Sequence, residues 1–87
     1  MARYQIIKSD EPVRGIVITR NHGEYVAEYY CDNEFGAYVK EKEIGLGEHL
    51  EITLTELAKK AREALNKPKV KVYFDEWFFG EHMKVFF

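Results

Sequence analysis

The pattern of apolar and polar positions is clearest between Ile52 and Pro68, where it has the period of an α-helix. Thr53 and Glu56 have the spacing of a capping box, which predicts that the helix begins directly after Thr53. Pro68 has no backbone N–H to donate and therefore ends the helix. Apolar side chains recur at steps of three and four residues and form one stripe. The stripe consists of Leu54, Leu57, Ala58, Ala61, Ala64 and Leu65.

The residues before this helix alternate between apolar and polar with the period of β-strands. The expected strands are residues 3–8, 13–20, 24–31 and 37–43. If the second and third close around a loop of residues 21–23, Arg20 pairs with Glu24 and Ile18 with Val26. This register places one group of side chains on the face of the sheet away from the helix. That group is Arg14, Ile16, Ile18, Arg20, Glu24, Val26, Glu28 and Tyr30.

The residues after the helix predict a closing β-hairpin, residues 69–79 and 82–87, that turns at Gly80 and Glu81. This turn puts Phe74 opposite Phe87. One face of the hairpin is expected to lie beneath the helix, and it carries Val70, Val72, Phe74, Phe78, Met83, Val85 and Phe87. The other face carries four rings, Tyr73, Trp77, Phe79 and Phe86. Because contiguous exposed aromatic area usually marks a contact site, these rings are the leading candidate binding surface.

These elements together predict an α+β fold of one domain, residues 1–87. One α-helix packs on one face of a mostly antiparallel β-sheet of five to six strands, in the chain order β-β-β-β-α-β-β. Residues 44–52 are compatible with a loop or with a short return strand. The alternating charges of residues 40–43 are typical of a solvated edge.

Charge and cysteine content narrow the classes of function. A net charge of −2 argues against duplex DNA and against an anionic membrane as partners. No stretch reaches the roughly 20 apolar residues that cross a bilayer, and the first residues lack the apolar core of a secretory signal. Cys31 is the only cysteine, so no internal disulfide forms. This suits a reducing compartment, and we expect a cytoplasmic protein.

We interpret the chain as a small non-catalytic protein that binds a protein partner, or a second copy of itself, through the aromatic face of its sheet. Trp77 is the expected anchor, with Tyr73, Phe79 and Phe86 around it. Ile16, Ile18 and Tyr30, together with Arg14, extend this surface if the two groups adjoin in the sheet, and the pattern does not determine the strand order. The small size also suits an inhibitor of a larger enzyme or machine.

Other interpretations of the same residues stay open. The rings could stack the unpaired bases of a single-stranded nucleic acid, with Lys71 and Lys84 near the phosphates. His22, His49 and His82 lie close to glutamates, as in some metal-dependent enzymes. No H-E-x-x-H or C-x-x-C spacing is present, so we expect no metal, no cofactor and no catalytic residue. Burial of the rings within the chain itself would remove the docking surface altogether.

Overall fold

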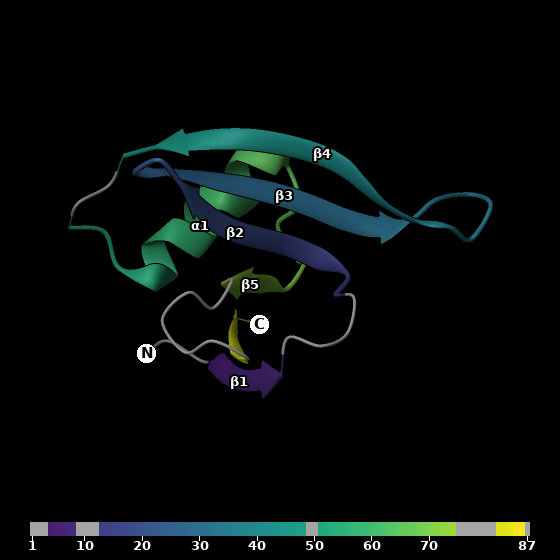
Figure 1. Ribbon diagram of the computed structural model, residues 1–87, viewed down its shortest axis with the longest axis horizontal. Coiled ribbons are helices and arrows are strands. Elements are labelled where there is room, and N and C mark those ends of the chain that lie inside the picture. Colours follow the sequence, from purple (N-terminus) through teal and green to yellow (C-terminus); the bar gives the residue numbers. More distant parts are fainter. Residues whose placement is uncertain (1–3, 9–12, 49–50, 75–81, 87) are drawn as a thin grey trace.

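The computed structural model describes residues 4–8, 13–48, 51–74 and 82–86. In this part of the chain one helix, α1 (Leu54–Leu65), lies across one face of a six-stranded sheet (Figure 1). The strands are β1 (Tyr4–Lys8), β2 (Gly15–Asn21), β3 (Glu24–Asp32), β4 (Tyr38–Gly47), β5 (Val72–Phe74) and β6 (His82–Phe86). Their order in the sheet is β1-β6-β5-β2-β3-β4. The predicted α+β class, with a helix on one face of a sheet, is confirmed.

Capping residues define both ends of the helix, Thr53 at its start and Asn66 at its end. Thr53 is the N-cap, and its Oγ1 accepts a hydrogen bond of 3.2 Å from the Glu56 N–H. Asn66 adopts the left-handed conformation with φ 56°, and the Lys67 N–H donates to the Arg62 carbonyl at 2.9 Å. The buried side of the helix consists of Leu57, Ala58, Ala61 and Leu65, while Ala64 of the predicted stripe is exposed.

The sheet mixes parallel and antiparallel strand pairs. β2 runs parallel to β5, with Ile16 beside Val72 and Ile18 beside Phe74. The other neighbouring strands are antiparallel. Between β2 and β5 the chain forms the β3–β4 hairpin and then α1, so the helix carries it back to the centre of the sheet. Strand order was left open by the sequence pattern, and this parallel pair was not among its predictions.

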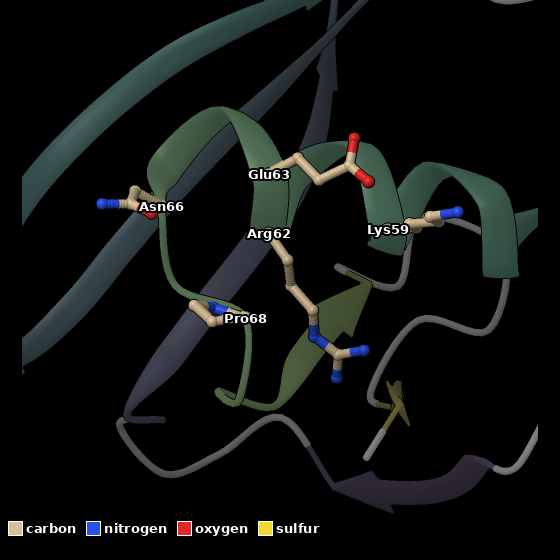
Figure 2. Close-up of a pocket in the computed structure, with 5 residues that line it drawn as sticks. All are labelled: Lys59, Arg62, Glu63, Asn66 and Pro68. Atoms are coloured by element: carbon tan, nitrogen blue, oxygen red, sulfur yellow. The ribbon is translucent and has the colours of Figure 1, made fainter.

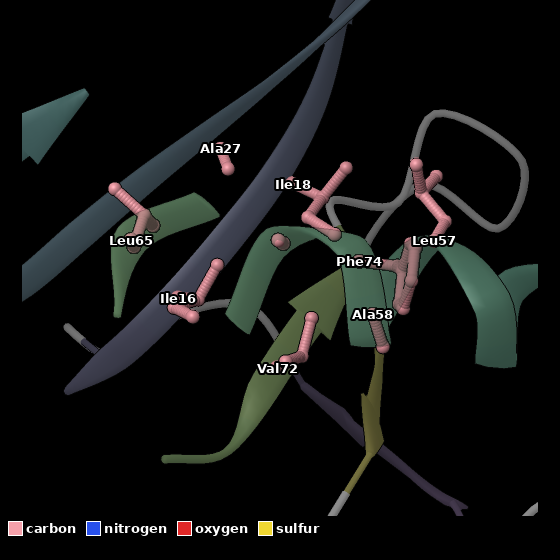
Figure 3. Close-up of a cluster of buried hydrophobic side chains, with 9 residues drawn as sticks. Ile16, Ile18, Ala27, Leu57, Ala58, Leu65, Val72 and Phe74 are labelled. Atoms are coloured by element: carbon pink, nitrogen blue, oxygen red, sulfur yellow. The ribbon is translucent and has the colours of Figure 1, made fainter. Parts of the chain in front are cut away.

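The main core lies between α1 and the sheet (Figure 3). It consists of Ile16, Ile18, Ala27, Leu57, Ala58, Ala61, Leu65, Val72 and Phe74. β2 supplies Ile16 and Ile18 of this cluster, and its parallel neighbour β5 supplies Val72 and Phe74. Since Val72 and Phe74 were predicted beneath the helix, that part of the interpretation is confirmed.

The predicted register of β2 and β3 is wrong by one residue. The chain turns at His22 and Gly23, both with positive φ (52° and 84°), so the loop has two residues instead of three. Ile18 consequently pairs with Ala27. Because side chains alternate along a strand, this change moves Ile16 and Ile18 to the helix face, where both are fully buried. They cannot extend a docking surface on the opposite face.

The predicted register of the last hairpin is also wrong. Phe74 pairs with Lys84 rather than Phe87, and Tyr73 pairs with Val85. The displacement is an odd number of residues and therefore exchanges the two faces of the last strand. Val85, predicted beneath the helix, is buried on the face away from it. Apolar residues occupy consecutive positions in this hairpin, at residues 72–74, 77–79 and 85–87, so the alternation pattern did not distinguish the two registers.

β4 is longer than the sequence pattern predicted. It extends from Tyr38 to Gly47, so residues 44–47 continue the edge strand and are not a separate element. The predicted turn at residues 80 and 81 lies outside the described residues.

Candidate interaction surface

The face of the sheet away from α1 has a small core of its own. Val17, Tyr73 and Val85 are buried there, and Val13 and Tyr30 pack against them while partly exposed. Tyr73 was predicted as an exposed ring, but only 8% of it is exposed. Burial accordingly raises the pKa of its phenol. Tyr73 therefore belongs to the interior of the protein and not to its binding surface.

The tyrosine stack, defined as Tyr30 and Tyr38, lies on this same face at the β3–β4 end. The two ring centroids are 5.6 Å apart and the planes differ by 13°. The Tyr38 hydroxyl donates a hydrogen bond of 2.6 Å to the Val13 carbonyl. The Arg14 guanidinium lies 5.5 Å from the Tyr38 ring centroid, within cation–π range. Tyr38 is thus held at several points, yet 38% of it remains exposed.

Ion pairs surround the tyrosine stack. Arg14 Nε lies 2.9 Å from Asp32 Oδ2, and Lys40 Nζ lies 3.1 Å from Glu28 Oε2. The Tyr30 hydroxyl donates to the same Glu28 oxygen at 3.3 Å. Partial burial, followed by the negative charge of Glu28, raises the pKa of Tyr30. The rings therefore lie within a rim of paired charges rather than beside one dominant charge.

The loop between β3 and β4 presents the most exposed large apolar side chain of the described residues. Phe35 is 86% exposed. Asn33 Oδ1 accepts hydrogen bonds from the backbone N–H groups of Phe35 and Ala37, both at 2.9 Å. Gly36, with φ 80°, donates its N–H to the Asn33 carbonyl at 3.0 Å. In Figure 1 this hairpin projects beyond the rest of the sheet, so Phe35 is carried outward on a braced turn.

The predicted anchor residues are only partly covered by the structure. Trp77 and Phe79 lie outside the described residues. Phe86 is placed by its backbone, between Tyr4 of β1 and Val72 of β5. Of the seven predicted contact residues, only Tyr30 joins the tyrosine stack. Phe35 and Tyr38 were missed, although a phenylalanine inside a polar turn, Asn33 to Gly36, was a visible signal.

Cys31 and the histidines do not assemble a reactive centre in the described residues. The Cys31 thiol donates to Glu41 Oε2 at 3.0 Å, and this hydrogen bond is the main cause of its raised pKa. A raised thiol pKa lowers the thiolate fraction and so the nucleophilicity at neutral pH. His22 is exposed in its turn, while His49 and the His82 side chain are not described. Within the described ranges, no three His, Cys, Asp or Glu residues are placed to hold a metal.

A hollow beside the C-terminal half of α1 has a volume of about 430 Å³ (Figure 2). Its lining residues are Lys59, Arg62, Glu63, Asn66 and Pro68. Arg62 extends from the helix toward β5 and donates through Nε to the Val70 carbonyl at 2.8 Å. Small-molecule sites are mostly lined by hydrophobic and aromatic residues, whereas four of the five residues that line this hollow are charged or polar. It is better described as a surface depression than as a ligand pocket.

Comparison of the chain with protein-family models, curated proteins and solved structures finds no match. The function is therefore argued from the geometry of the β3–β4 end alone. Among the described helical residues, none form a helix long and apolar enough to span a membrane.

Proposed function

We propose that this chain is a non-catalytic protein-interaction module that docks a protein partner through the β3–β4 end of its sheet. The observation that carries the proposal is the exposed Phe35 on a turn braced by Asn33 and Gly36. Full burial of a phenylalanine side chain stabilises by about 1.5–3 kcal/mol, which is available here only through a contact with another molecule.

The braced turn favours docking because little conformational freedom remains to be lost. Ordering a flexible side chain at an interface costs about 0.5–1.5 kcal/mol, and flexible loops add to that cost. The Asn33 bonds hold the Phe35 backbone before any partner arrives. The same reasoning applies to Tyr38, whose hydroxyl and ring are both engaged within the chain. Preorganised aromatic residues of this kind are enriched among those that dominate binding energy.

The tyrosine stack and its ion pairs extend this surface along the face away from α1. Arg14 and Lys40 alternate there with Asp32 and Glu28, which supports complementarity with a protein surface of mixed charge. Tyr30 keeps the contact role that its sequence position suggested. Contributions from Trp77 and Phe79 remain sequence-based predictions. Phe86 pairs with Val72 and so occupies a helix-face position of the sheet, which corrects its prediction as part of this surface.

A single-stranded nucleic acid fits this surface less well. Tyr30 and Tyr38 already stack on one another, and a base would have to displace that contact. The neighbouring cations Arg14 and Lys40 each contact a carboxylate, so a phosphate would compete with Asp32 or Glu28. Binding of a protein requires neither rearrangement.

The test is quantitative affinity capture from an extract of the source cells, comparing wild-type chain with Phe35→Ala. Loss of an aromatic hot spot costs about 2 kcal/mol or more, so partner affinity should fall about 30-fold. The thermal transition should not change, because the side chain is 86% exposed. Glu34→Ala, on the same turn, is the matched control and should retain the partner. Equal recovery by Phe35→Ala and wild type would contradict the proposal.

A further inference from the structure

The outer edge of β4 carries a charge pattern of which the proposed docking surface uses only Lys40. β4 is the last strand in the sheet order, and no described strand pairs with its outer side. Figure 1 places this edge opposite the edge formed by β1. Residues 40–43 read Lys-Glu-Lys-Glu. An edge strand presents backbone groups to which a further strand can add.

We propose that β4 pairs antiparallel with β4 of a second copy of this chain, around a two-fold axis between Glu41 and Lys42. Lys40 then lies opposite Glu43 of the second copy, and Glu41 opposite its Lys42. Opposite charges directly across two antiparallel strands stabilise the pair, and like charges destabilise it. The two-fold axis repeats each attractive pair, so all the charges of residues 40–43 are matched.

An irregularity in β4 makes this pairing geometrically possible. Residues opposite one another across antiparallel strands share a face, whereas residues three apart in a regular strand do not. In β4, Lys40 pairs with Tyr30 and Lys42 with Tyr29, so Glu41 is an extra, bulged residue. The bulge brings Lys40 and Glu43 to one face, where Nζ and Oε2 are 3.6 Å apart. The symmetric pairing requires that shared face.

The residues that flank the charges are complementary in the same register. Val39 lies opposite Ile44 of the second copy, and both pair within their own chain with helix-face positions of β3. Tyr38 lies opposite Gly45 of the second copy. The Tyr38 ring leans over its own chain, on Tyr30 and toward Val13, and the glycine opposite it adds no side chain to the seam.

The order of the charges favours this register over the two registers that are displaced by one residue. Moving one strand by a single residue in either direction puts lysine opposite lysine and glutamate opposite glutamate. Charged edges usually prevent association between unrelated strands. The Lys-Glu-Lys-Glu order retains that protection, and the register centred between Glu41 and Lys42 is the antiparallel self-pairing that matches all four of its charges.

The test measures the solution mass of the full chain by sedimentation equilibrium over a range of concentrations. The wild-type chain should approach twice 10.3 kDa as its concentration rises. Glu41→Lys alone and Lys42→Glu alone each replace attractive cross-strand pairs with repulsive ones, and each should weaken dimerisation about tenfold. Both side chains are exposed, and circular dichroism should show each variant folded.

The discriminating result comes from an equimolar mixture of the two single variants. In the heterodimer, position 41 of the Glu41→Lys chain faces position 42 of the Lys42→Glu chain with the opposite charge, and the second pair is equally attractive. The mixture, and separately the double variant, should therefore recover wild-type association. A chain that stays monomeric at about 1 mM overturns the proposal, as does a dimer insensitive to these exchanges. Phe35→Ala should leave the dimer mass unchanged, which separates this result from the docking proposal.

Discussion

Gly15 is the residue at which backbone geometry most tightly constrains the fold. It has φ 143°, and a Cβ at this position would lie 2.6 Å from the Lys71 carbonyl oxygen. That oxygen accepts the Ile16 N–H at 3.0 Å and so joins β2 to the start of β5. The same added carbon would lie 3.1 Å from the Tyr73 ring. Only glycine permits this approach without displacing the parallel strand pair.

Gly15→Ala should therefore lower the free energy of unfolding by about 2 kcal/mol or more, because strain and a displaced strand both contribute. Gly45→Ala is the matched control, since its added carbon meets nothing within 4 Å. The control should change stability by less than about 0.5 kcal/mol. Because Gly45 lies in the proposed β4 pairing, urea unfolding at a protein concentration low enough to keep the chain monomeric measures both. Equal effects of the two substitutions would mean that the Lys71 carbonyl does not limit residue 15.

The helix and the β3–β4 turn are the elements whose local sequence specifies their structure. Thr53 and Glu56 lie three residues apart and meet within one helical turn, so their contact could be predicted without knowledge of the rest of the fold. The β2–β3 hairpin is different. Its loop is one residue shorter than the sequence pattern predicted. That difference alone places Ile16 and Ile18 in the core instead of on the predicted surface.

At the level of the β3–β4 turn, Asn33→Ala removes the acceptor of two backbone hydrogen bonds, from Phe35 and Ala37. The turn is exposed, so stability should fall by only about 1 kcal/mol. Partner affinity should fall with it, although Phe35 itself is unchanged, because the ring is no longer held in place. Asn33→Asp keeps an oxygen acceptor and should retain most of the affinity. Titration calorimetry with the captured partner compares the two variants, and equal loss would contradict a bracing role.

At the scale of the whole molecule, strand order decides which side chains are buried on each face of the sheet. No local sequence pattern encodes that order. α1 covers the sheet over β2, β3 and β4, while Tyr73 and Val85 close a second small core on the opposite face. The aromatic surface predicted around Tyr73 is thus partly interior. The exposed aromatic residues of the described chain lie instead at the far end of the β3–β4 hairpin, as Phe35 and Tyr38. The pairing of β2 with β5, which are far apart in the sequence, places Tyr73 beside Val17 in the interior.

The sequence-based prediction of an interaction protein rests on this same scale, whereas the residues proposed to perform that role do not. Charge balance, the single cysteine and the absence of catalytic spacing are properties of the whole sequence and already favoured an interaction protein. Naming contact residues required two strand registers, and each depends on where a short turn closes.

Photocrosslinking from position 35 tests the proposed docking surface most directly. A benzoylphenylalanine placed there, in the full chain and in an extract of the source cells, should form a covalent adduct with a partner protein. The same group at Lys59, exposed on the helix, should form none. Absence of an adduct from position 35, or an adduct of only twice 10.3 kDa, would contradict a separate partner site at this turn.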